Sequence, residues 1–179
     1  MRKFLTLALA VLATSAMAQV PADALLKQAL GTAKSSHKNV FVRFTASWCG
    51  WCQKMQGVLD QKEVKPIWDK YFVSTAIVVL ENGDKEKNEN PGGEALMEAN
   101  GGKNQGIPFF YFIDGQTGKP IVNSLMPPVG TAKAANVGCP YEPNEIEFFM
   151  QLLKKSAPKM SEDERGTIRK AFESLKKAG

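Results

Sequence analysis

Hydrophobic positions change their period early in the chain, which predicts a helix followed by a buried strand. Between residues 21 and 38 apolar side chains recur at intervals of three and four, the spacing of an amphipathic helix that begins at a proline. Residues 40–44, Val-Phe-Val-Arg-Phe, are mostly β-branched or aromatic and predict a strand buried on both faces. A second helical pattern begins near residue 50, and we expect Pro66 to break that helix.

The middle of the chain predicts three more strands. Residues 72–80 form a nearly continuous apolar run, typical of a buried strand, and a polar loop at 81–91 leads to a short helix at 93–99. Two further strands, 109–113 and 119–125, flank the sequence Asp-Gly-Gln-Thr-Gly. This composition is typical of a hairpin turn, so the two strands are expected to pair antiparallel.

The C-terminal part predicts two helices after a long loop. Residues 126–143 contain four prolines and are expected to be a loop, and helices follow at 145–156 and 161–177. Ser161 and Glu164 have the spacing of a capping box at the start of the last helix. The order of elements predicts an α/β fold with a central mixed sheet, helices on both faces and an additional C-terminal helix.

The first 18 residues have the pattern of a signal peptide. Arg2 and Lys3 precede an apolar run at 4–13, and Ala-Met-Ala at 16–18 supplies small residues at a cleavage site. The run is shorter than the roughly 20 residues that span a bilayer, and no later segment is longer, so we expect no membrane span. The sequence therefore predicts export, to the bacterial periplasm, of a single domain at 19–179.

Composition and charge exclude several classes of protein. The chain has 179 residues, 44% apolar and 23% charged, which is typical of a soluble globular protein and excludes a collagen or a fully disordered chain. The formal net charge is +5, and removal of Arg2 and Lys3 would lower it. Lysines near the C-terminus alternate with acidic residues, which indicates a solvated helix face. No basic stripe with aromatic residues appears, so nucleic-acid binding is not expected.

The chemistry is expected at Cys49 and Cys52, where a predicted strand changes into a predicted helix. In a first helical turn two sulfurs three residues apart can approach bonding distance. Cys49 would lie at the helix N-terminus, where unpaired N–H groups and the helix dipole stabilise a thiolate, so it is the expected nucleophile. Cys52 would resolve a mixed disulfide. Between them, Gly50 and Trp51 offer no cation, so we expect moderate oxidising power.

Residues 44–55, with Trp48 before the cysteine pair, and Ile107-Pro108 further along resemble the thioredoxin family. The likeness is clearest over residues 40–125, and the Cys-Gly-Trp-Cys centre is similar to that of exported thioredoxin-like proteins. The resemblance implies a thioredoxin fold, dithiol–disulfide exchange with protein substrates, and a redox partner that is not identified. It also implies a cis bond before Pro108, with Ile107 exposed for backbone pairing with an extended substrate.

Two residues depart from the family pattern. Thioredoxins place a buried acid six residues before the first cysteine, and this chain has Arg43 there. A cation near the cysteine pair would lower a thiol pKa, but an unpaired buried arginine is costly, so we expect Arg43 to turn toward solvent or an acidic side chain. Cys139 lies in the long loop. It is either an inert buried thiol, a cross-link between two chains, or an internal partner that competes for Cys49.

Other functions of the cysteines have less support. A static disulfide closing so short a loop would stabilise little, and haem attachment would need a histidine after Cys52, where Gln53 stands. A zinc site would have only the three cysteines and His37 as candidate ligands. Copper binding with the help of Met55, Met97 and Met126 stays open, as does a thioredoxin-fold binding module without turnover.

The leading hypothesis is an oxidoreductase with no metal and no cofactor except its redox-active disulfide. Its site would comprise Cys49 and Cys52, the substrate-binding residues Trp48, Gly50, Trp51, Ile107 and Pro108, and the accessory candidates Arg43 and Cys139.

Overall fold

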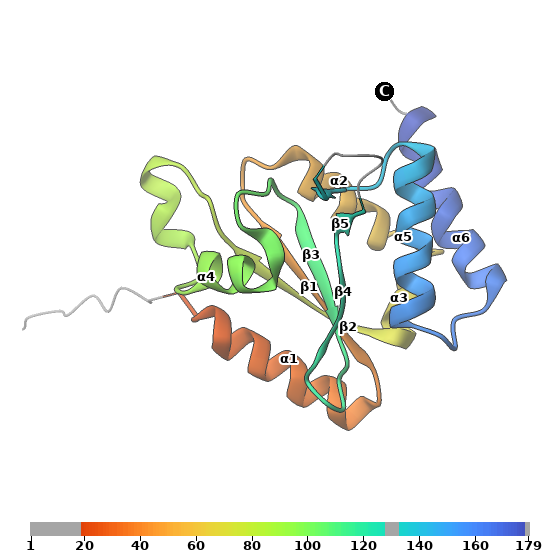
Figure 1. Cartoon of the computed structure of the whole chain (residues 1–179), viewed down its shortest axis with the longest axis horizontal. Helices are drawn as coiled ribbons and strands as arrows, with labels where there is room; N and C mark the ends of the chain where they lie inside the picture. The colour runs from red at the N-terminus through yellow and green to blue at the C-terminus, as the bar shows by residue number, and fades with distance from the viewer. Residues whose placement is uncertain (1–18, 128–132, 178–179) are drawn as a thin grey trace, which may run out of the picture.

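A mixed sheet of four strands lies at the centre of the computed structural model, which describes residues 19–127 and 133–177 (Figure 1). The strand order is β2-β1-β3-β4, with β1 and β2 parallel and the other neighbours antiparallel. The strands are β1 (Asn39–Thr45), β2 (Phe72–Val78), β3 (Phe109–Ile113) and β4 (Pro120–Asn123). The predicted antiparallel hairpin is confirmed as β3 and β4.

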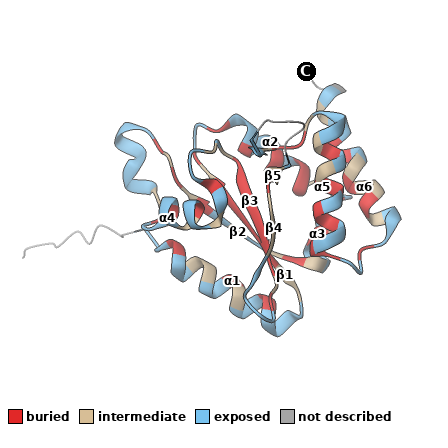
Figure 2. Cartoon of the chain, in the orientation of Figure 1, coloured by how far each residue is buried: buried red, intermediate tan, exposed pale blue. Residues whose placement is uncertain are grey.

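Helices cover both faces of the sheet, as the sequence predicts. Side chains alternate along β1, so that Val40, Val42 and Phe44 pack on one side with the buried alanines of α1 (Ala22–Ser36) and with α4 (Gly93–Met97). Figure 2 shows the central strands buried between the two helical layers. β1 and β3 are buried on both faces, which explains why they are nearly continuous apolar runs. β2 lies at the edge of the sheet with Ser74 and Ala76 exposed, so the predicted buried strand at 72–80 is only partly buried.

The opposite face of the sheet carries a large aromatic cluster. Phe41 packs edge-on against Trp68, with ring centroids 5.0 Å apart, and Phe149 packs against Phe172 at the same distance. Aromatic side chains each bury a large apolar area, so they dominate the stability of such a core. The helices on this face are α2 (Gly50–Leu59), α3 (Lys65–Tyr71), α5 (Pro143–Ser156) and α6 (Glu162–Glu173).

Pro66 starts a helix rather than ending one. The helix that begins at Gly50 already ends at Leu59, and Pro66 lies in the first turn of α3, a separate helix that the sequence did not predict. Proline fits the first turn because the N–H groups there have no partner within the helix. The polar segment 81–91 likewise contains a 3-10 helix, η1 (Gly83–Asn88).

Short additional elements follow α4 and β4. A single π-helical turn, η2 (Glu98–Gly102), continues from α4, where the sequence predicted a helix ending at residue 99. The predicted strand 119–125 is divided into β4 and β5 (Leu125–Met126). Within the predicted loop 126–143, β6 (Ala135–Asn136) pairs antiparallel with β5, and residues 128–132 lie outside the described part.

Both C-terminal helices begin at capping boxes. The predicted box at Ser161 and Glu164 is confirmed at the start of α6, and a second box, formed by Glu142 and Glu145, begins α5. The last α-helix ends at Glu173 and continues as a 3-10 turn, η3 (Ser174–Lys177). No helix in the described ranges has the length and hydropathy needed to cross a membrane. The predicted signal peptide at 1–18 lies outside those ranges.

Candidate functional site

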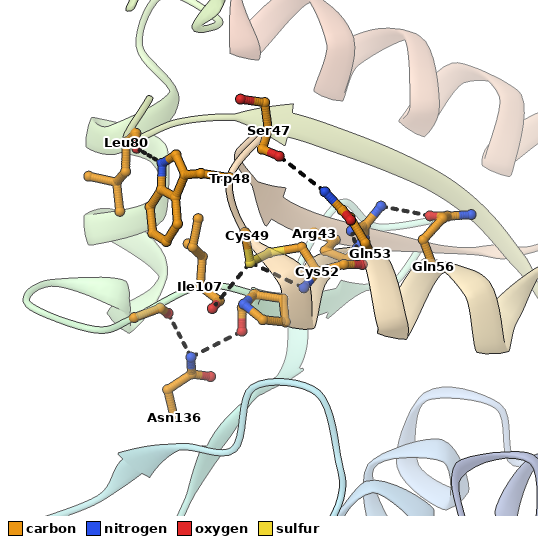
Figure 3. The surroundings of a disulfide bond; sticks show 12 residues. Arg43, Ser47, Trp48, Cys49, Cys52, Gln53, Gln56, Leu80, Ile107 and Asn136 are labelled. Atoms are coloured by element: carbon orange, nitrogen blue, oxygen red, sulfur yellow. Dashed lines mark hydrogen bonds between the residues drawn. A yellow bond between two sulfur atoms is a disulfide. The ribbon is translucent and has the colours of Figure 1, made fainter. Parts of the chain in front are cut away.

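Cys49 and Cys52 form a disulfide at the N-terminus of α2 (Figure 3). Cys49 is the N-cap residue, and its Sγ accepts a hydrogen bond from the Cys52 N–H at 3.1 Å. Both side chains are buried. The position places Cys49 Sγ at the positive end of the helix dipole, where a thiolate would be stabilised after reduction.

The loop before β3 brings Ile107 and Pro108 to the disulfide. The Ile107–Pro108 peptide bond is cis, as the sequence resemblance implies. The Ile107 carbonyl oxygen lies 3.6 Å from Cys49 Sγ, and the Ile107 side chain packs against a small cluster of Ala46, Cys49 and Cys52. Residues 58 positions apart in the chain therefore meet at the disulfide.

Two exposed tryptophans flank the cysteine pair. Trp48 is 52% exposed and Trp51 is 43% exposed, although large apolar side chains are usually buried. The Trp48 indole N–H donates to the Leu80 carbonyl at 2.6 Å, which fixes the ring. Trp51 packs edge-on against Tyr141, with centroids 5.3 Å apart. Exposed aromatic surface of this kind is typical of sites that contact another protein.

The surface around the cysteine pair has free space above Gly50 and a groove beside Trp51. Gly50 is exposed, and no atom would lie within 4 Å of a Cβ added there, so packing does not require glycine at this position. A groove of about 450 Å³ begins at Trp51. Its lining includes Ile107, Pro108 and Cys139, so three predicted substrate-binding residues and one accessory candidate share one hollow.

Arg43 does not turn toward solvent or toward an acidic side chain, so that expectation is wrong. Its side chain lies under α2, where Nη1 donates to the Cys52 carbonyl at 3.1 Å and Nη2 donates to Gln56 Oε1 at 2.6 Å (Figure 3). The residue is only 7% exposed. Burial lowers the pKa of the guanidinium, and the nearby Asp60 opposes that change. The two hydrogen bonds explain how an arginine is accommodated in this position.

Cys139 is a free, buried thiol that packs in the core on the α5 side of the sheet. Burial raises the pKa of this thiol to about 12. In this structure Cys49 is bonded to Cys52 and not to Cys139. Cys139 also lines the groove that begins at Trp51, and the three possibilities raised by the sequence for this thiol stay predictions.

Two polar residues near the disulfide were not singled out from the sequence. Buried Glu81 accepts hydrogen bonds from the Ser47 N–H at 2.7 Å and from the Ser47 hydroxyl at 2.8 Å. Asn136 donates to the carbonyl oxygens of Gly106 and Pro108 on either side of Ile107. Both residues lie in polar segments that were interpreted as loops, and no local pattern distinguishes them from their neighbours.

Two of the three methionines considered for copper, Met55 and Met97, lie in the core on opposite faces of the sheet. Met55 packs in the aromatic core beneath α2, whereas Met97 packs on the other face of the sheet with α1. Between residues 19 and 127 and between 133 and 177, no three His, Cys, Asp or Glu side chains are grouped to hold a metal ion. His37 is exposed and forms the C-cap of α1.

A model of the thioredoxin-like family matches residues 22–115. Among solved structures, the chain is similar to the disulphide isomerase from Xylella fastidiosa Temecula1, with 20% identity, a TM-score of 0.46 and coverage of 84% of this chain and 88% of that chain. It is similar to the oxidised DsbD C-terminal domain of Neisseria meningitidis, with 25% identity, a TM-score of 0.43 and coverage of 75% and 99%. A thioredoxin from Thermus thermophilus has 23% identity, a TM-score of 0.42 and coverage of 80% and 94%. No curated protein matches the chain.

Proposed function

Because the chain belongs to the thioredoxin-like family and has a thioredoxin fold with a disulfide-bonded cysteine pair, we propose that it is an exported oxidoreductase that exchanges disulfides with proteins. One observation carries the proposal. Cys49 caps the N-terminus of α2 and lies 3.6 Å from the Ile107 carbonyl oxygen, at a surface with two exposed tryptophans. A stabilised thiolate, a backbone edge and an apolar contact surface are what exchange with a protein needs.

In the reducing direction, the Cys49 thiolate attacks one sulfur of a substrate disulfide. A bond forms between Cys49 and that sulfur, and the other substrate sulfur leaves as a thiolate. Cys52 then loses its proton and attacks Cys49 Sγ, which restores the Cys49–Cys52 disulfide and releases the second substrate thiolate. Two electrons pass from the cysteine pair to the substrate, and the two released thiolates take up protons from water. The reverse sequence oxidises a substrate dithiol.

We assign the surrounding residues to substrate binding. Trp48 and Trp51 would provide apolar contact on the two sides of Cys49, while Ile107 and Pro108 would shape the groove for an extended chain. A dithiol donor of another protein would reduce the Cys49–Cys52 disulfide again after each turnover. The measured reduction potential decides the direction of exchange, because about 30 mV changes the equilibrium tenfold.

Insulin reduction with dithiothreitol as the donor tests the exchange. We expect turnover in the wild-type protein. Turnover retained in Cys139→Ala would show that the buried free thiol takes no part in the exchange. Cys49→Ser should lose the activity, and Cys52→Ala should accumulate a mixed disulfide through Cys49. Full activity of Cys49→Ser would exclude the proposed chemistry. Substrate binding without turnover in the wild type would instead indicate a binding module.

Export is tested on the protein made in a bacterial cell. The small residues at 16–18 support cleavage after Ala18, so the mature protein should begin at Gln19 and be found in the periplasmic fraction. Intact-mass measurement of the fractionated protein checks this. An uncleaved chain that stays in the cytoplasm would contradict the proposal of export without affecting the proposal of disulfide exchange.

A further inference from the structure

The Asn136 side chain uses all of its hydrogen-bonding capacity at the loop beside the disulfide. Its Nδ2 donates to the Gly106 carbonyl at 2.7 Å and to the Pro108 carbonyl at 3.0 Å, as Figure 3 shows. Its Oδ1 accepts from the Ser124 hydroxyl at 2.7 Å and from the Gly138 N–H at 3.2 Å. A carboxamide has two donor hydrogens and two acceptor lone pairs, so all four are used in these hydrogen bonds.

This carboxamide is fixed from the central sheet. Ser124 is fully buried, and its hydroxyl accepts from the Phe110 N–H of β3 at 3.2 Å while it donates to Asn136. The Ser124 backbone pairs with Phe110 on one side and with Val137 on the other. The Asn136 N–H also donates to Gln105 Oε1 at 3.1 Å. The position of the Asn136 side chain is therefore set by strand pairing rather than by the loop that it contacts.

The two carbonyls that Asn136 binds lie on either side of Ile107. The Ile107 carbonyl oxygen is left facing Cys49 Sγ, at 3.6 Å. The Ile107 N–H has no hydrogen-bond partner among residues 19–127 and 133–177. Cys49 Sγ carries no hydrogen while it is bonded to Cys52, so the Ile107 carbonyl can still accept one from a bound chain. An N–H and a C=O available on one residue are the groups by which an extended chain adds to a backbone edge.

We propose that Asn136 is a positioning residue for protein substrates, because its carboxamide holds the Gly106 and Pro108 carbonyls and thereby presents the Ile107 backbone to an extended substrate chain. The inference rests on the proposed function and specifies how the substrate is recognised. The groove beside Ile107, lined also by Trp51 and Gly138, gives that chain room. Recognition through the backbone is independent of substrate sequence, so the substrate class is any exported protein with an extended segment around its disulfide.

Two variants separate the donors of Asn136 from its acceptors. Asn136→Ala removes all four hydrogen bonds. Asn136→Asp keeps the acceptors for Ser124 and Gly138, but its carboxylate cannot donate to the Gly106 and Pro108 carbonyls. In both variants we expect the KM for insulin to rise about five- to tenfold, the effect of losing one or two backbone hydrogen bonds, with little change in kcat.

Two further measurements distinguish a positioning role from a purely structural one. They are the reduction rate of a small disulfide and the reduction potential of the cysteine pair. Bis(2-hydroxyethyl) disulfide has no peptide backbone to pair with Ile107, so its reduction rate should be the same in wild type and in Asn136→Ala. The reduction potential of Asn136→Ala should also equal that of the wild type, because this substitution changes no charge and removes no hydrogen bond at either sulfur. An equal loss of activity toward insulin and toward the small disulfide would overturn the proposal. An unchanged KM for insulin would also overturn it.

Asn123→Ala is the matched control. Asn123 is a half-buried asparagine on β4 of the central sheet, and it donates to the Asn100 carbonyl at 3.0 Å and accepts from the Leu125 N–H at 3.1 Å. Asn123 contacts η2 and not the loop beside the disulfide, so the KM of Asn123→Ala for insulin should equal that of the wild type. An equal rise in KM for Asn123→Ala would contradict a specific role for Asn136. No insulin reduction by the wild type itself would contradict the proposed function instead.

A measurement on Cys52→Ala does not depend on the folding of the Asn136 variants. In the mixed disulfide of Cys49 with a cysteine-containing peptide, hydrogen exchange of the Ile107 N–H should slow at least tenfold relative to the free protein. The Asn136 Nδ2 hydrogens should be protected in both states. Unchanged exchange at Ile107, or unprotected Asn136 hydrogens, would overturn the inference.

Discussion

Arg43 places a positive charge where a thioredoxin has a buried acid. Its guanidinium binds the Cys52 carbonyl and Gln56, so the charge lies beneath the second cysteine of the pair. A buried cation favours a neighbouring anion, whereas a buried carboxylate would favour a neutral thiol. We therefore expect Arg43 to stabilise the reduced, thiolate-containing form of the pair relative to the disulfide.

Replacing Arg43 by methionine should make the protein a weaker oxidant. Without the cation the reduced form loses stabilisation, so the reduction potential of Arg43→Met should fall by about 20–30 mV. Equilibration with a glutathione buffer measures the potential. Gln56→Met is the control, because it removes the neutral partner of Arg43 and keeps the charge. A potential that is unchanged or higher in Arg43→Met would contradict this role.

At the scale of elements, the site is built where the ends of three strands meet. The segment after β1 carries the cysteines, the segment after β2 carries Glu81, and the loop before β3 carries Ile107. Glu81 joins the first two of these segments through its two hydrogen bonds to Ser47. The Trp48 indole adds a third bond, to the Leu80 carbonyl, so the chain entering α2 is held on one side by the end of β2.

Glu81→Ala should therefore destabilise the protein and loosen the Trp48 region. Loss of two hydrogen bonds to a charged, buried acceptor should lower the free energy of unfolding by about 2–4 kcal/mol. Urea unfolding measures the change. The Trp48 ring should become more exposed to solvent, which would shift its fluorescence emission to longer wavelength. Glu86→Ala, at an exposed position of η1, should change stability by less than about 0.5 kcal/mol. Equal stability of the two variants would contradict the role given to Glu81.

At the scale of the whole molecule, the C-terminal helices complete the core on one face of the sheet. The family model ends at residue 115, but the aromatic cluster continues from Phe110 of β3 through Phe149 of α5 to Phe172 of α6. The same face holds Cys139, while Tyr111 lies in the core on the other face. Each face thus buries one group that ionises only at high pH.

Stability should decrease as the pH rises from about 9 to 12. Burial raises the pKa of Cys139 from 9.0 and that of Tyr111 from 10.0, each to about 12. The unfolded chain releases these protons at a lower pH than the folded chain, so their contribution is complete below pH 9 and is lost as the pH rises toward 12. Urea unfolding at several pH values measures the slope.

The double variant Cys139→Ala/Tyr111→Phe isolates the contribution of these two groups. Because it has no thiol or phenol at either position, its free energy of unfolding should depend less on pH over this range than that of the wild type. Lysine titration is common to both proteins and cancels in the comparison. The same pH dependence in both proteins would show that the two buried groups do not contribute.

The amino-acid sequence by itself predicted the strands of the central sheet, most of the helices and the position of the cysteine pair. The strand at 40–44, the hairpin at 109–125 and the capping box at Ser161 follow from patterns within short, continuous stretches of sequence, because side-chain periodicity, turn composition and helix capping are local. Cys49 and Cys52 could be assigned for the same reason. Their spacing is one helical turn, and the change of period at Gly50 indicates where that helix begins.

Only the tertiary structure decided which distant polar groups meet at the site. Asn136 is 30 residues from Gly106, and Ser47 is 34 residues from Glu81, so neither contact leaves a pattern in a local stretch of sequence. The direction of Arg43 depended on the same information, since the acceptors that make its burial tolerable are on α2. Strand pairing and helix packing bring such partners together, because a buried polar group must find its hydrogen bonds wherever the fold places them.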